Sequence, residues 1–116
     1  ELHPYFNQEK QRKWNKEHNI VTQSWSPLGR ANSILKEERI GEIAKVHKKT
    51  ISQIILRWHI QLGAIPIPKA TSKQHQSDNL NIFDFELSDV EMKNICKLTC
   101  KSGRTNNQDP AVYEEF

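Results

Sequence analysis

The sequence predicts an α/β fold in which short parallel strands alternate with helices. Two short segments with strand character, at residues 20–25 and 64–67, are each followed by turn residues and then by helical patterns. Residues 1–4 read as the end of a third extended segment, because the residue before a proline is biased away from helix. Strands that alternate with helices imply a parallel sheet with right-handed crossovers. Three strands cannot close a barrel, so we expect part of a larger arrangement.

The first half of the chain is predicted to contain one polar and one amphipathic helix. Asn7 is expected to cap a helix over residues 8–18, in which Trp14 is the main apolar side chain and is expected to pack. A strand over residues 20–25 follows, and Ser-Pro-Leu-Gly at residues 26–29 closes it. The spacing i, i+3, i+4, i+7 then predicts a helix through Ile40, Ile43, Ala44 and His47.

A capping box opens the next helix. Thr50, with Gln53 at the third helical position, starts a helix that Gly63 ends. Its apolar face comprises Ile51, Ile54, Ile55, Trp58 and Leu62. Residues 64–67 are too few for a helix and are expected to form a buried strand, which Pro68 ends.

Two shorter helices are predicted after this strand. The first covers residues 73–79. The second begins at another capping box, formed by Ser88 and Glu91, and Leu87 and Met92 stand where a hydrophobic staple places its two residues.

The composition argues against several classes of protein and several classes of partner. Hydrophobic residues make up 35% of the chain, which is thin for a self-sufficient core when globular domains contain about 45–50% with glycine counted. No apolar run approaches the roughly 20 residues of a transmembrane helix, and the first residues lack a signal-peptide pattern, so we expect no membrane contact. The net charge of +3 is modest and its bases are interleaved with acids, so we expect no nucleic-acid partner.

The two cysteines, Cys96 and Cys100, are four residues apart and are expected to pack along one face of a helix. Their number and context form neither a disulfide framework nor a zinc site, and we therefore expect no metal. A reducing, cytoplasmic location is the simpler inference.

The carboxyl ends of the predicted strands contain the candidate binding residues. In α/β folds ligands bind at these ends, which here are residues 3–4, 25–29 and 68–72. Together they offer an aromatic ring, hydroxyls, a glycine turn, a lysine and a helix start. This inventory suits an aromatic ligand that carries phosphate.

The order and spacing of several strings resemble the C-terminal part of the aldo-keto reductases, NADP(H)-dependent enzymes folded as a (β/α)8 barrel. The strings are ELHPYFNQ, SWSPLG, KKTISQIILRWHIQLG, IPIPKA, SDNLNIFDFELSDVEM and the late pair Asp109-Pro110. The small bacterial reductases of keto acids and aldehydes are the most similar members. The resemblance implies an α/β fold that is the C-terminal part of a (β/α)8 TIM barrel, with more than half of the family's chain absent.

The resemblance also implies a division of the chain. Residues 1–100 correspond to the barrel from the end of the sixth strand to the last helix. Residues 101–116, which show no periodicity, correspond to a C-terminal tail that sets substrate specificity in the family.

Family binding roles transfer only to matching positions. Trp25 takes the place of the aromatic residue that stacks on the nicotinamide, and the following turn matches the segment around the pyrophosphate. Lys69 matches the lysine at the 2′-phosphate, Ser72 lies beside that phosphate, and the pair at 78–79 matches the adenine site. The expected cofactor-binding residues are Trp25, Ser26, Pro27, Leu28, Gly29, Lys69, Ala70, Thr71, Ser72, His75, Asp78 and Asn79.

Two of these positions depart from the family pattern. Ala70 replaces a serine, which removes one hydroxyl, and His75 replaces an arginine, which is a permanently charged, forked donor. A histidine is charged only near or below about pH 6.5. We therefore expect NADP(H) as cofactor through Lys69, with a preference over NAD(H) that weakens as pH rises.

No catalytic residue is expected in this chain. The family's Asp, Tyr, Lys and His set lies in the part that has no match here, and neither Tyr5 nor Tyr113 lies in a matching motif. The first hypothesis is a parent oxidoreductase that reduces small aldehydes and ketones, with this chain as its cofactor-binding half. The alternative is a non-catalytic fragment that binds a nucleotide or a partner, and the chain is expected to be able to self-associate.

Overall fold

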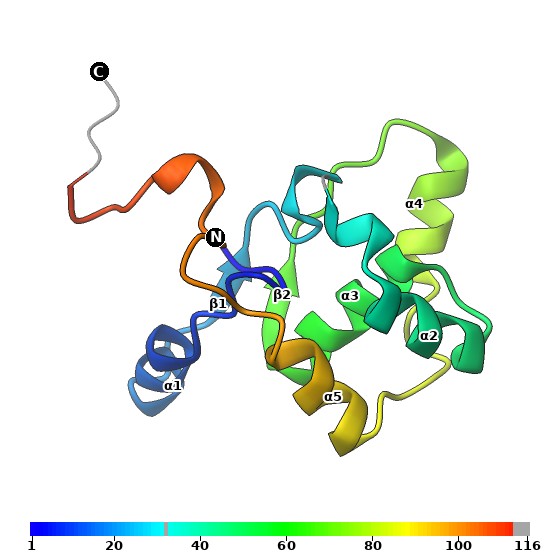
Figure 1. Cartoon of the computed structure of the whole chain (residues 1–116), viewed down its shortest axis with the longest axis horizontal. Helices are drawn as coiled ribbons and strands as arrows, with labels where there is room; N and C mark the ends of the chain where they lie inside the picture. Colours follow the sequence, from blue (N-terminus) through cyan, green and yellow to red (C-terminus); the bar gives the residue numbers. More distant parts are fainter. Residues whose placement is uncertain (32, 113–116) are drawn as a thin grey trace.

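A computed structural model of the chain describes residues 1–31 and 33–112 and shows an α/β arrangement around a small parallel sheet (Figure 1). Strands β1 (Thr22–Ser24) and β2 (Ala64–Pro66) pair in parallel, with Thr22 opposite Ala64 and Ser24 opposite Pro66. The crossover between them contains helices α2 (Glu38–His47) and α3 (Ile51–Gln61).

The remaining elements lie outside this crossover or form short turns within it. Helix α1 covers Glu9–Glu17, and α4 (Lys73–Leu80) and α5 (Asp89–Cys96) follow β2. Three 3-10 turns cover Gly29–Ala31, Ser33–Lys36 and Thr105–Asn107. None of the helices in residues 1–31 and 33–112 is long and apolar enough to cross a membrane.

Both predicted capping boxes are confirmed. The backbone N–H of Gln53 donates to Thr50 Oγ1 at 3.2 Å, and the Thr50 N–H donates to Gln53 Oε1 at 3.0 Å. The same reciprocal pair joins Ser88 and Glu91 at the start of α5. Gly63 follows α3 with a φ of 76°, a conformation that glycine adopts without a Cβ penalty.

Helix α1 begins one residue later than an Asn7 cap would place it. Gln8, with a φ of 46°, is the residue before the helix, although Asn7 Oδ1 still accepts the Glu9 N–H at 3.1 Å. Trp14 does not pack into a core, since 48% of its surface is exposed and its ring stacks on His18 with centroids 4.0 Å apart. No residue of α1 is buried, so Trp14 has no buried neighbour within its own helix.

The segment at residues 1–4 does not join the sheet of the described chain. His3 instead forms an isolated antiparallel bridge with Phe6, because the chain turns back at Pro4 and Tyr5. The segment is fixed to α3 through His59, whose ring nitrogens lie 2.8 Å from the Ile55 carbonyl and 3.0 Å from the Leu2 carbonyl. His59 is fully buried, and this burial lowers its pKa.

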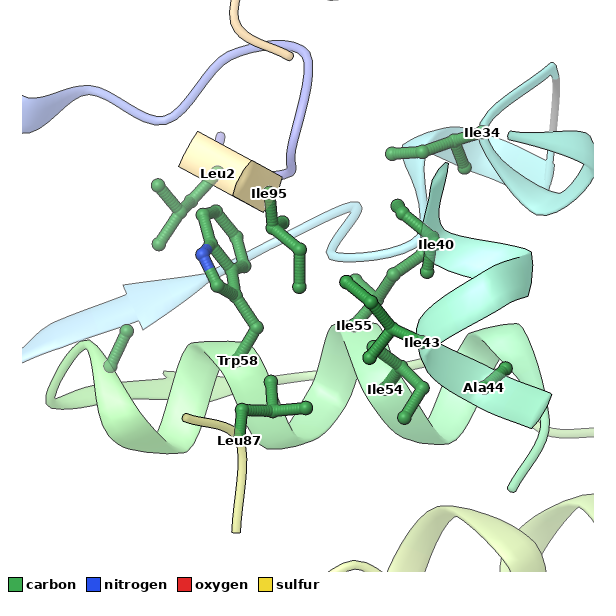
Figure 2. Close-up of a cluster of buried hydrophobic side chains, with 11 residues drawn as sticks. Leu2, Ile34, Ile40, Ile43, Ala44, Ile54, Ile55, Trp58, Leu87 and Ile95 are labelled. Carbon is green, nitrogen blue, oxygen red and sulfur yellow. The ribbon is translucent and has the colours of Figure 1, made fainter. Parts of the chain in front are cut away.

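The core lies between α3, α2 and α5 (Figure 2). Trp58 of α3 is fully buried, and Figure 2 shows its ring beside Leu2 and Ile95. Its Nε1–H donates to Cys96 Sγ at 3.4 Å, so Cys96 is a packing residue as expected. Cys100 is exposed, contrary to expectation, because it follows the end of α5 rather than lying on its inner face.

Only one face of the two-stranded sheet is covered in the described chain. Residues 64–67 were expected to be buried, but Ile65 is 49% and Ile67 is 56% exposed, and only Ala64 is buried. Side chains alternate along a strand, and α3 packs against β2 on the side of Ala64. The opposite side, which we call the open sheet face, consists of Val21, Gln23, Ile65 and Ile67.

Candidate functional site

The candidate site begins where the two strands end. Ser24 is the last residue of β1, and its carbonyl accepts the N–H of Ile67 at 3.0 Å. Because the strands are parallel, this bond places the loop after β1 beside the loop after β2. The two loops contain most of the residues that the sequence predicts to bind a cofactor.

The loop after β1 is a tight turn. The Gly29 N–H donates to the Ser26 carbonyl at 2.9 Å. Ser26, Gly29 and Arg30 have φ values of 49°, 56° and 56°, so three residues adopt the left-handed conformation within one short segment. Gly29 occupies this conformation without a Cβ penalty, which accounts for a glycine at that position.

A cleft of about 640 Å³ separates the two loops. Polar and charged groups enter it from both sides, among them the exposed Lys69 and His75. Its lining residues are Ser26, Pro27, Leu28, Arg30, Ile67, Pro68, Lys69, Thr71 and His75. The structure therefore brings Ser26, Pro27, Leu28, Lys69, Thr71 and His75, all predicted from the sequence, to one cavity.

Two further predicted residues lie at the border of this cleft. Trp25 directly follows β1, and 41% of its surface is exposed. Ser72 is the N-cap of α4, and its Oγ accepts the His75 N–H at 3.1 Å. The cap fixes His75 in the first turn of α4, where the helix dipole favours anions.

The other predicted residues do not line the cleft. Gly29 is buried in the turn, and Ala70 is half-buried between Lys69 and Thr71. Asp78 and Asn79 lie in the last turns of α4, where Asp78 Oδ1 accepts from Gln74 Nε2 at 2.9 Å and the Asp78 carbonyl accepts from Gln53. An extended ligand in the cleft has to reach along α4 to contact this pair.

Arg30 lines the cleft and was missed by the sequence reasoning. Its guanidinium carbon lies over the Trp25 ring, 5.7 Å from the ring centroid. The sequence did contain an indication that Arg30 belongs to the site, since this arginine directly follows the Ser-Pro-Leu-Gly turn.

The cleft is electropositive. Within residues 1–31 and 33–112, neither Arg30 nor Lys69 forms an ion pair with a carboxylate. Arg30 and Lys69 therefore line a cavity whose lining residues include no carboxylate, and His75 places the first turn of α4 beside it, an arrangement that suits a ligand with phosphate groups. The described residues contain no group of His, Cys, Asp or Glu able to hold a metal ion.

The fold defines the class of the chain. Parallel strands with a helical crossover, and a cleft at their carboxyl ends, are the features of part of an α/β barrel. The family model for the aldo/keto reductase family matches residues 1–99, and the chain belongs to that family.

Curated relatives that match most or all of the chain support this assignment. The chain is 43% identical over 116 residues to 2,5-diketo-D-gluconic acid reductase B of Corynebacterium sp., covering 100% of this chain and 41% of that protein. It is 46% identical over 100 residues to a 9,11-endoperoxide prostaglandin H2 reductase of Trypanosoma cruzi, covering 84% of this chain and 35% of that protein.

Solved structures share the fold. The crystal structure of a Gox0644 mutant in complex with NADPH superposes with a TM-score of 0.92 at 41% identity, covering 99% of this chain and 42% of that one. The aldo-keto reductase MGS-M4, from a deep-sea metagenome library, superposes with a TM-score of 0.91 at 28% identity, over 99% of this chain and 42% of that one. The chain thus spans about two fifths of these proteins and corresponds to part of a (β/α)8 barrel.

Proposed function

We propose that the cleft between the loops after β1 and β2 binds NADP(H), and that the parent protein reduces small aldehydes or ketones with it. One observation supports this most strongly: two loops from distant parts of the sequence, each predicted to contact a phosphate-bearing cofactor, line the same electropositive cleft. The NADPH complex of a structural neighbour and the carbonyl reductases among the relatives support the same proposal.

The residues present fit such a cofactor. The half-exposed indole of Trp25 offers a face for the nicotinamide, and Ser26, which lines the cleft, offers a hydroxyl near the pyrophosphate. Lys69 and His75, on the other side of the cleft, would hold the 2′-phosphate that distinguishes NADP(H) from NAD(H). Asp78 and Asn79 would meet the adenine farther along α4.

These positions distinguish the role of the cofactor from the roles of the residues in this chain. When bound, the nicotinamide supplies the hydride that a carbonyl carbon accepts. This chain's own residues bind and orient the cofactor, and none of them is proposed as a proton donor. We therefore expect the 116-residue chain alone not to oxidise NADPH when it is given a carbonyl substrate.

Backbone NMR of the isotope-labelled chain tests where the cofactor binds. On addition of NADPH, the amide signals of Ser26, Leu28 and Gly29 and those of residues 69–72 should shift with one common dissociation constant. The signals of α5 and of residues 101–105 should remain in place, because they lie outside this cleft. Shifts confined to those distant segments, or the absence of shifts at saturating NADPH, would overturn the proposed site.

The second proposal is a partner-binding role, and the open sheet face favours it. Val21 is 67% exposed, and Ile65 and Ile67 are about half exposed on adjacent strands. Such apolar surface on paired strands favours association with another chain. In the isolated chain we propose a second copy as the occupant.

A further inference from the structure

Arg30 and Trp25 form a contact that the proposed cofactor site does not use. The guanidinium carbon of Arg30 lies 5.7 Å from the centroid of the Trp25 ring and over its face. Trp25 is nonetheless 41% exposed, so the contact is at the surface and can open without unfolding the turn. The two residues are held near each other by the hydrogen bond from the Gly29 N–H to the Ser26 carbonyl.

The guanidinium of Arg30 competes with any planar ligand that stacks on the same face of the Trp25 indole. A planar group that stacks on the face of the indole over which the guanidinium lies meets the cation there. The cation has to leave that face first. Arg30 is therefore part of the energetics of stacking, whether or not it touches the planar group.

Arg30 has a stronger partner available when a phosphate enters the cleft. It lines the cleft together with Lys69 and pairs with no carboxylate among the described residues. A guanidinium binds phosphate through two parallel charge-assisted hydrogen bonds, and these are stronger than a cation–π contact at an exposed site. A phosphate in the cleft should therefore draw the guanidinium away from the ring.

We propose that Arg30 is a phosphate-dependent cover of the Trp25 ring. In the free chain the guanidinium lies over the indole, and a ligand with a phosphate or diphosphate moves it into the cleft and uncovers the ring for stacking. A planar ligand without phosphate has to displace the cation unaided. Arg30 thus selects ligands that combine a ring with a phosphate, and this inference rests on the proposed binding of a dinucleotide in the same cleft.

Side-chain NMR of Arg30 reads the contact directly. Protons above an aromatic ring are shifted upfield, so the Arg30 δ protons should lie upfield in the free chain and return to ordinary positions when inorganic diphosphate is added. Trp25→Leu should remove the upfield shift in the absence of diphosphate. Lys69→Gln is the matched control, because it removes another cation of the cleft and keeps both partners of the contact, and it should leave the shift of the free chain intact.

Ligand selection gives a second readout. Nicotinamide mononucleotide and nicotinamide riboside share the ring and differ by one phosphate, and the wild-type chain should bind the mononucleotide at least about tenfold more tightly. Arg30→Gln should reduce this ratio by weakening the mononucleotide and strengthening the riboside, since the ring is no longer covered. A variant that weakens both ligands equally would contradict a cover and indicate a simple contact.

The two proposals fail in different ways. NADPH could shift the amide signals of both loops while the signals of the Arg30 δ protons stay unchanged. That result would overturn the proposal that Arg30 covers the Trp25 ring and would leave the proposed cofactor site intact. If neither NADPH nor diphosphate shifts any residue of the cleft, the proposed function and the cover are both overturned. Arg30 δ protons at ordinary positions in the free chain would overturn the cover alone.

Discussion

The Ile67 N–H donates to the Ser24 carbonyl at 3.0 Å, beyond the last paired residue of β2. The two residues are 43 positions apart in the sequence (67 minus 24), yet this bond fixes the start of both loops that line the cleft. The candidate site is thus a consequence of strand pairing.

The contact between His47 and Glu91 predicts a loss of stability in acid. His47 Nε2 lies 2.9 Å and 3.0 Å from the two carboxylate oxygens of Glu91 and joins α2 to α5. Desolvation raises the pKa of Glu91, but the hydrogen bonds from the Ser88 backbone and from His47 outweigh it and leave the pKa below its ordinary value. A lowered folded-state pKa stabilises the fold above the unfolded value of about 4.3, and this stabilisation disappears as pH falls through the folded value.

Urea unfolding at about pH 7 and about pH 3.5 measures this effect. Glu91→Gln is the informative variant, because its amide oxygen can still accept the Ser88 N–H of the capping box. The wild-type chain should lose about 1 kcal/mol more than the variant between the two pH values. Equal losses would show that the Glu91 carboxylate does not stabilise the fold.

Gly103 is predicted to be intolerant of any side chain. A Cβ at this position would lie 1.8 Å from the Tyr5 carbonyl oxygen, a backbone atom that is itself held by the Cys100 N–H at 3.0 Å. Gly103→Ala should lower the free energy of unfolding by about 1–3 kcal/mol in thermal or urea melts.

Gly41→Ala is the matched control for that substitution. Gly41 lies inside α2, and the nearest atom to an added Cβ is Ile51 Cδ1 at 3.8 Å. Alanine there should raise stability by about 0.5–1 kcal/mol, because it is the better helix former. A neutral result for Gly103→Ala beside a stabilising Gly41→Ala would mean that residues 100–105 do not pack against Tyr5 in solution.

The open sheet face predicts concentration-dependent association of the isolated chain. Its apparent mass by light scattering should rise with concentration, and Ile65→Asn should reduce the rise, because the 49% exposed Ile65 lies on that face. Val46→Asn is the control, since Val46 is 75% exposed but lies on α2. A monomeric wild-type chain at every concentration would contradict this role of the face.

His75 predicts that cofactor preference depends on pH. A histidine gains a positive charge as pH falls, so the contribution of the side chain at position 75 to the ratio of NADH to NADPH dissociation constants should be larger at about pH 6 than at about pH 8. His75 lines the cleft beside Lys69, where an added charge strengthens contact with the 2′-phosphate. Because the 2′-phosphate itself takes up a proton at about pH 6, the informative quantity is the difference between the wild-type chain and His75→Gln. The variant should lower the ratio more at about pH 6 than at about pH 8, and an equal effect at both pH values would contradict the role of His75.

Local features of the fold were predictable from the sequence because their causes are local. The Thr50 and Ser88 capping boxes and the Gly63 helix end depend on residues within four positions of each other, and all three were found where predicted. The exposure of Ile65 was not predictable in the same way. A run of apolar residues looks the same whether the chain covers both faces of the strand or only one.

The site was predictable in part for the same reason. Lys69 and the turn at residues 26–29 are recognisable as strings, and both line the cleft. The contact of Arg30 with Trp25 depends on the left-handed conformations of residues 26, 29 and 30, which no periodicity reveals. That Asp78 and Asn79 lie outside the cleft also depends on the direction of α4, which the sequence pattern does not determine.

The central claim is that this cleft binds a phosphate-bearing dinucleotide through Lys69, and calorimetric titration of Lys69→Gln tests it most directly. NADPH affinity should fall about tenfold or more, whereas NADH affinity should change by less than about twofold, because only NADPH has the 2′-phosphate. Lys73→Gln, on the exposed first residue of α4 outside the cleft lining, should alter neither. Equal losses for both cofactors in Lys69→Gln, or no loss for either, would contradict the account.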